Sequence, residues 1–173
     1  TVPPGDIRNV LVALSDIPEK QKSIFQYRFK SEDKTMNGHS LGNLIILATS
    51  EMQGSIYQAI QLLAKMMYVD GHVYPASEEP LILHARYKDG TFGEGESHIA
   101  HPNKTIDYVS VSTTDPEKKT AKAGKKVVSS IMDADMVVLG PGSLYTSILP
   151  SLMIPEVGQA IIDTPAQVLY ICN

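Results

Sequence analysis

The chain has 173 residues, of which 43% are hydrophobic and 20% are charged, and its formal net charge is −4. This length suffices for one domain with a real core, and the lack of a basic excess argues against a nucleic-acid-binding surface. No apolar run approaches the ~18 residues of a membrane helix, so we expect no membrane insertion. The single cysteine, Cys172, leaves no internal disulfide and no cysteine-rich metal site.

The two ends of the sequence indicate a piece of a longer protein. It opens with TVPPGD, without a methionine or a charged leader, and it closes on the strand-like VLYICN. We therefore expect residues 1–173 to form a single α/β domain that is an interior portion of a longer chain.

The first 30 residues predict two short helices. Proline and glycine precede Asp6, a plausible helix cap, and the following apolar residues recur with helical spacing. The apolar residues with this spacing are Ile7, Val10, Leu11 and Leu14. Residues 17–29 continue the helical pattern, with Ile24, Phe25 and Phe29 expected on one side.

Two further helices are predicted after a polar loop. Residues 41–52 are apolar nearly all round, which is typical of a buried helix. Residues 55–67 form the clearest amphipathic pattern in the chain. The apolar positions of this second helix are Ile56, Ile60, Leu63 and Met67.

The middle of the sequence changes to the period of a β-strand. Residues 81–87 alternate between an apolar face, with Leu83 and Tyr87, and a face that carries His84 and Arg86. The Asp-Gly pair at 89–90 tolerates positive φ, which predicts a hairpin with the segment that follows. Residues 106–113 are predicted to be a further strand.

The final third alternates between helical and strand patterns. Residues 125–135 predict a helix with Val127, Val128 and Ile131 facing inward, and residues 136–140 predict a short strand. A helix at 154–164 and a strand at 167–173 follow. This alternation is typical of an α/β fold with a parallel sheet.

The loop GPGSLYTS, residues 140–147, stands where a strand turns into a helix. Gly140 and Gly142 allow a sharp turn and a close approach to a ligand, and Ser143 stands at a helix N-cap position. Backbone N–H groups at such a position favour an anion. The pattern is compatible with a plain structural turn or with a phosphate cradle. The candidate phosphate-binding residues here are Gly140, Gly142, Ser143, Leu144, Tyr145 and Thr146.

Two more loops carry small and polar residues at predicted helix starts. In GHSLGN, His39, Ser40 and Asn43 are candidate ligand contacts, although a lone histidine more often makes an ordinary loop hydrogen bond. In PPGDIRN, the candidates are Arg8 and Asn9. An arginine binds phosphate in a bidentate manner, and a salt bridge with a nearby carboxylate is the competing interpretation.

The sequence shows no recognisable metal or nucleophile motif. The five histidines lack the spacing of metal ligands, and there is no G-x-S-x-G elbow. We therefore predict no metal site and assign no catalytic residue.

The sequence resembles the bacterial gluconeogenesis factor family, which is related to the 2-phospho-L-lactate transferases. The resemblance is carried by PPGDIRNVLVALSD, FQYRF, GHSLGNLII, the Gly-Pro-Gly-Ser block and YICN, in that order along the whole chain. It implies a Rossmann-like three-layer fold with a mostly parallel sheet and an inserted β-hairpin, a cytoplasmic location and a homodimer. It also implies UDP-sugar binding and a role in cell shape and wall synthesis on gluconeogenic carbon sources, without an established reaction.

The transferase branch of this resemblance supplies the alternative function. It implies a Mg²⁺-dependent transfer of a phospholactyl group onto a deazaflavin alcohol. Where that branch tends to have an aspartate, this chain has Asn43, which carries no charge for Mg²⁺. The family's Gly-rich first strand and its acidic segment are also missing here.

We therefore expect a regulator whose bound pyrophosphate lies on the amides of residues 142–145, with help from Arg8 and Asn43. A scaffold that binds a protein partner and uses its glycines only as turns is the third interpretation.

Overall fold

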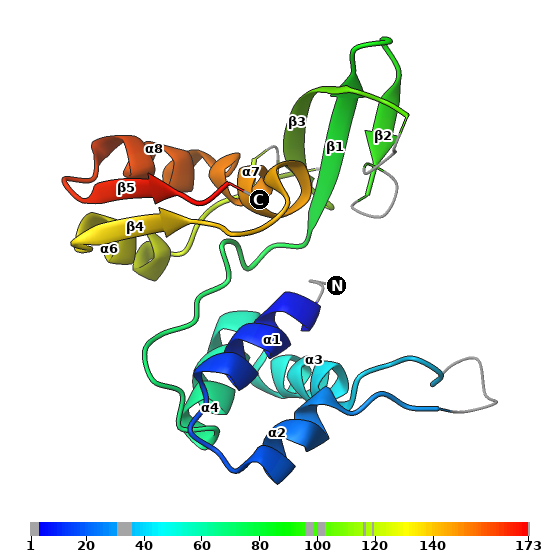
Figure 1. Ribbon diagram of the computed structural model, residues 1–173, viewed down its shortest axis with the longest axis vertical. Coiled ribbons are helices and arrows are strands. Elements are labelled where there is room, and N and C mark those ends of the chain that lie inside the picture. Colours follow the sequence, from blue (N-terminus) through cyan, green and yellow to red (C-terminus); the bar gives the residue numbers. More distant parts are fainter. Residues whose placement is uncertain are drawn as a thin grey trace. The chain divides into compact units, whose positions relative to one another are not determined.

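The computed structural model describes residues 4–30, 36–95, 99, 103–115, 117–118 and 120–172. The chain forms two compact units, Thr1–Pro75 and Ala76–Asn173 (Figure 1). The single domain expected from the sequence stays a prediction. Within the described residues, no helix is both long enough and apolar enough to cross a bilayer.

The first unit is helical. Its helices are α1 (Pro4–Leu14), α2 (Glu19–Gln26), α3 (Leu41–Gln53) and α4 (Ile56–Met66). The α3–α4 connection is short because Gly54 ends α3 with φ +70° and the Ser55 hydroxyl accepts the Gln58 N–H at the start of α4. All four apolar positions predicted for α4 are buried, so that amphipathic pattern is confirmed.

The short helix predicted at the start of the chain is confirmed as α1, but only part of its apolar stripe faces the core. Val10 and Leu14 are exposed, whereas Leu11 and Val12 are buried together with Arg8. The apolar stripe of a short helix allows more than one rotation, and packing against α3 and α4 selects the face.

The helix predicted at 41–52 exists, but only Gly42 and Ile46 of α3 are fully buried, so it is not buried all round.

The second unit contains a three-stranded antiparallel sheet. Its strands are β1 (Leu81–Tyr87), β2 (Phe92–Glu94) and β3 (Ile106–Thr113), in the order β2-β1-β3. The hairpin predicted at Asp89-Gly90 is confirmed, with Gly90 at φ +82°. On the face that includes Leu83, Ala85 and Tyr87, these buried side chains pack with Val109 and Ile99. The alternation read from the sequence therefore gives the core face correctly.

The rest of the second unit alternates between helices and strands. Its elements are α6 (Lys125–Met132), β4 (Met136–Leu139), a π-helical turn η1 (Leu144–Ile148), α7 (Leu149–Leu152), α8 (Pro155–Asp163) and β5 (Gln167–Tyr170). β4 and β5 lie side by side and are parallel, as predicted (Figure 1). Ile131 of α6 packs with Val157 of α8, and Val127 belongs to the same cluster.

The described chain is a mixed α/β protein, as predicted, but a Rossmann-like three-layer arrangement is not confirmed. Three of its strands form the antiparallel sheet, and the parallel sheet consists of β4 and β5 alone. The physical reason lies in the connections. The turn between β1 and β2 is too short for the crossover that a parallel pair requires.

Candidate functional site

Arg8 is a buried cation on the inner face of α1. Only 5% of its surface is exposed. Its Nη1 donates to Oδ1 of Asn43 at 3.0 Å, and its Nη2 donates to Oδ1 of Asn9 at 2.8 Å. Its Nε is buried without a hydrogen-bond partner among the described residues. The guanidinium is therefore held by neutral amides rather than by a carboxylate.

Arg8 forms no ion pair with a carboxylate in the part of the chain that the structure describes. None of the ion pairs among those residues includes it. Burial is the main cause that lowers the pKa of Arg8, and the charge of Arg28 lowers this pKa further, while Asp6 opposes the shift. An arginine stays protonated despite such shifts, and a buried charge without a partner is costly. This environment favours an added anion.

The N-terminus of α3 lies beside this guanidinium. The side chain of Ser40, the N-cap residue, donates to the carbonyl of Phe25 at 3.1 Å and makes no cap bond. The Leu41 N–H donates to the Tyr27 carbonyl, whereas the next two amides, of Gly42 and Asn43, are first-turn N–H groups without an intrahelical acceptor. Such amides and the helix dipole attract negative charge.

Gly42 brings the arginine against the helix. A Cβ atom at this position would lie 2.4 Å from the Phe25 carbonyl oxygen and 2.9 Å from Cδ of Arg8. Only a glycine allows the Arg8 stem to cross the first turn of α3 this closely. Gly42 is absent from the residues predicted from the sequence. The signal that could have identified it is its place immediately before Asn43 at a predicted helix start.

The remaining residues predicted for this loop have different surroundings. Ser40 is fully buried, and the side chain of His39 is exposed. Because Oδ1 of Asn9 and Oδ1 of Asn43 accept from Arg8, their Nδ2 groups are left as donors. The structure therefore brings Arg8, Asn9 and Asn43 together at the start of α3 as a cluster that presents hydrogen-bond donors.

The glycine loop at 140–147 lies in the second unit and has an open side. Ser143 is exposed, and its carbonyl accepts the N–H groups of Ser147 and Ile148 at 2.9 and 3.1 Å. Its hydroxyl makes no cap bond. Leu144 and Tyr145 are exposed, and Thr146 is half-buried. This corner of the described chain is therefore open to solvent at Ser143, Leu144 and Tyr145, and its role as a phosphate site stays a prediction.

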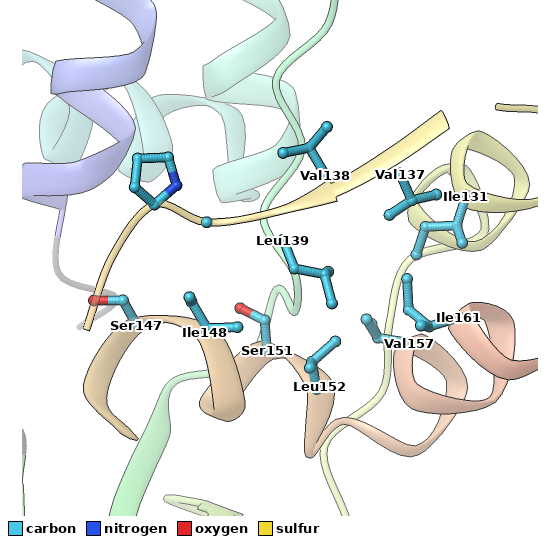
Figure 2. Close-up of a pocket in the computed structure, with 12 residues that line it drawn as sticks. Ile131, Val137, Val138, Leu139, Ser147, Ile148, Ser151, Leu152, Val157 and Ile161 are labelled. Atoms are coloured by element: carbon cyan, nitrogen blue, oxygen red, sulfur yellow. The ribbon is translucent and has the colours of Figure 1, made fainter. Parts of the chain in front are cut away.

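A cavity of about 390 Å³ lies next to this loop, but its walls are mainly aliphatic (Figure 2). Gly140, Pro141 and Ser147 line it, whereas residues 142–146 do not. Val137 and Leu139 of β4 point into it towards α6 and α8. The cavity therefore does not have the chemistry of a phosphate cradle.

The two glycines of this loop have different structural requirements. Gly140 has φ +92°, and a Cβ there would lie 2.9 Å from the Ile171 carbonyl oxygen. At Gly142 a Cβ would make ordinary contact with Ser147 at 3.4 Å.

We expect Gly140→Ala to lower the free energy of unfolding by about 1–3 kcal/mol and Gly142→Ala to change it by less than about 0.5 kcal/mol. Thermal unfolding measures both, and equal losses would contradict this distinction.

The two candidate clusters belong to different units, so the single phosphate site predicted from both loops stays a prediction. Among the described residues, no three His, Cys, Asp or Glu side chains are grouped to hold a metal ion. The Arg8 cluster thus consists of one buried guanidinium and side-chain amides, whereas the glycine loop carries hydroxyl groups and backbone N–H groups.

Comparison with known proteins identifies the family. The family model of the 2-phospho-L-lactate transferase CofD matches residues 1–173. The chain belongs to this family. It is 41% identical over 173 residues to the gluconeogenesis factor of Bacillus subtilis. It is also 54% identical over 171 residues to a Streptococcus pyogenes serotype M3 protein that is named as a candidate gluconeogenesis factor.

Solved structures agree with this CofD-family membership. A crystal structure of a Bacillus halodurans protein matches 99% of this chain with a TM-score of 0.92 and 41% identity. A second crystal structure of that protein, described as a member of the UPF0052 family, matches with a TM-score of 0.91. The chain spans 53% of the Bacillus halodurans chain and 52% of each of the two relatives. It therefore covers about half the length of the proteins it matches.

Proposed function

We propose that this chain is part of a nucleotide-sugar-binding regulatory protein of the gluconeogenesis factor type. The ligand we propose is a UDP-sugar, and the role is in cell shape and wall synthesis on gluconeogenic carbon sources. The proposal includes the cytoplasmic location and the homodimer that the family resemblance implies. The relatives named as gluconeogenesis factors support the type of protein, and the surroundings of Arg8 support the ligand class.

The observation that carries the proposal is the buried guanidinium of Arg8 without a carboxylate partner. A ligand phosphate would supply the missing negative charge and would accept from the N–H groups of Gly42 and Asn43. Hydrogen bonds to charged groups are worth about 1.5–3 kcal/mol each. A few of them would account for most of the affinity of a phosphate-bearing metabolite.

The same chemistry favours binding over the Mg²⁺-dependent transferase alternative. Mg²⁺ is held in proteins by carboxylates and phosphates, whereas the Arg8 cluster presents a guanidinium and amide donors. Asn43 uses its one side-chain oxygen to accept from Arg8. We therefore propose that this cluster recognises the anion directly, without a metal ion and without catalysis.

Calorimetry of this chain with UDP-N-acetylglucosamine in EDTA tests the proposal. We expect a saturable heat in EDTA, and we expect uridine, which lacks phosphate, to bind at least about 100-fold more weakly because it loses the charge-assisted hydrogen bonds. The absence of any heat with the nucleotide sugar, both in this chain and in the family-length Streptococcus pyogenes relative, would contradict nucleotide-sugar binding. Formation of a phosphodiester from a deazaflavin alcohol, a phospholactyl nucleotide donor and Mg²⁺, detected by mass spectrometry, would favour the transferase.

A further inference from the structure

The antiparallel sheet of the second unit has one face that carries polar side chains from all three strands. The central strand β1 lies between β2 and β3 (Figure 1). His84 of β1 stands between two residues that face the core, so its side chain lies on the opposite face. Glu94 of β2 and Ser110 of β3 are its partners in register, and Ser112 follows on the same face of β3. The sheet therefore brings an acid, an imidazole and two hydroxyl groups together.

The ring of His84 faces a hydroxyl with one nitrogen and a carboxylate with the other. Its Nε2 lies 2.8 Å from Oγ of Ser112, which is hydrogen-bond distance. Its Nδ1 lies 3.8 Å from Oε2 of Glu94. Because the carboxylate favours a proton on Nδ1, we assign Nε2 as the acceptor of the Ser112 hydroxyl proton. A hydroxyl, a base and a group that orients the base are the parts of an activated nucleophile.

The carboxylate of Glu94 is not shared with the arginine on the same face. Arg86 donates to Oδ2 of Asp107 from Nε at 3.0 Å and from Nη2 at 2.6 Å. Asp107 is the residue of β3 that the register with β1 skips, and such an irregularity re-aims a side chain. Among the described residues, the ion-pair contact of Glu94 is the one with His84. The sheet thus gives the imidazole a carboxylate of its own.

This group of side chains lies on an open part of the surface. The side chain of His84 is 35% exposed and that of Glu94 is 68% exposed. Ser112 is half-buried. A small activated ester, which requires no enclosing pocket, is the class of substrate that suits such a site.

We propose that Ser112 is a reactive serine that accepts an acyl group from a small activated ester or thioester, with His84 as the general base and Glu94 as a positioning residue. Oγ of Ser112 attacks the carbonyl carbon, and its proton moves to Nε2 of His84. The bond between that carbon and the leaving oxygen or sulfur then breaks, and the leaving atom takes the proton from Nε2. The products are an O-acyl serine and the protonated leaving group. This activity is separate from the ligand binding proposed for Arg8, which belongs to the first unit.

Reaction of the whole chain with p-nitrophenyl acetate tests the proposal, with nitrophenolate release followed by absorbance. A positioned general base typically contributes 10²- to 10⁴-fold. We therefore expect acetylation of Ser112, located by mass spectrometry, to be at least about 100-fold faster than in His84→Gln. Ser110→Ala is the matched control, because Ser110 lies on the same face opposite His84 and does not hold the Nε2 hydrogen bond. This variant should keep the rate of the parent chain.

Nitrogen NMR of the His84 ring tests the role of Glu94, because the ¹⁵N shifts distinguish a proton on Nδ1 from one on Nε2. We expect the Nδ1 proton in the parent chain and a shift towards the Nε2 proton in Glu94→Gln. The same variant should be acetylated at least about tenfold more slowly, since that tautomer leaves Nε2 unable to accept a proton. Its melting temperature should change by less than about 2 °C because the side chain is exposed.

Three outcomes would overturn the proposal. One is a parent chain whose acetyl groups are confined to lysine side chains, which would make the contact between Ser112 and His84 an ordinary cross-strand hydrogen bond. Another is an unchanged rate of Ser112 acetylation in His84→Gln. The third is the same tautomer and the same rate in Glu94→Gln, which would leave the carboxylate without a positioning role. Cooperative thermal unfolding of each variant at the temperature of the parent chain is the control for the folded state.

Discussion

Replacing Gly42 with alanine should destabilise the first unit by about 2–4 kcal/mol. The added Cβ would lie 2.4 Å from the Phe25 carbonyl oxygen, which is backbone and cannot move without shifting the end of α2. It would also lie 2.9 Å from Cδ of the buried Arg8. Forcing a methyl group into such a contact usually costs 1–3 kcal/mol, and the displacement of a buried guanidinium adds to that cost.

Gly5→Ala is the matched control for this substitution. Gly5 lies in α1, and a Cβ there would meet nothing within 4 Å. Because alanine is favoured over glycine in a helix, this variant should be unchanged or more stable by up to about 1 kcal/mol. Denaturant titration of both variants gives the comparison. A Gly42→Ala variant as stable as the parent chain would show that Arg8 and α3 do not pack as described.

Replacing Arg8 with methionine should separate ligand binding from stability. We expect the affinity for UDP-N-acetylglucosamine to fall by about 10- to 100-fold, because the ligand phosphate loses a charge-assisted partner. The stability should change little. Methionine fills a similar volume and removes a buried charge whose Nε has no partner, which offsets the loss of the hydrogen bonds to Asn9 and Asn43.

Calorimetry and thermal unfolding of the same sample measure the two effects. Arg86→Met is the control, because Arg86 lies on β1, is exposed and pairs with Asp107 at 2.6 Å. This variant also removes one positive charge, so a general electrostatic effect would weaken binding in both variants. A large loss of stability in Arg8→Met with unchanged affinity would assign Arg8 a purely structural role.

The position of Arg8 also explains why its role is difficult to read from the sequence. The residue follows Ile7 in a helix whose apolar positions suggest a different inward face, and a charged side chain is expected to face water. Only the packing of α1 against α3, with Gly42 at the contact, turns Arg8 inward. From its chemistry the sequence predicted a phosphate ligand here, which stays a prediction, but it did not predict the burial of the side chain.

Local patterns in the sequence determined much of the secondary structure. The helix α4, the strand β1 and the hairpin at Asp89-Gly90 follow from spacing and turn chemistry alone, because periods of 3.6 and 2 and a positive φ are properties of short segments. The ordered motifs also indicated the family to which the chain belongs.

Contacts between distant segments decided the rest. The tertiary structure selected the buried face of α1, and it restricted the parallel sheet of the described chain to β4 and β5. It also distinguished Gly140, which needs its positive φ, from Gly142, which does not. The physical reason is the same in each case: the pairing of strands and the burial of a charge depend on residues far apart in the chain, and no local pattern records which of them meet.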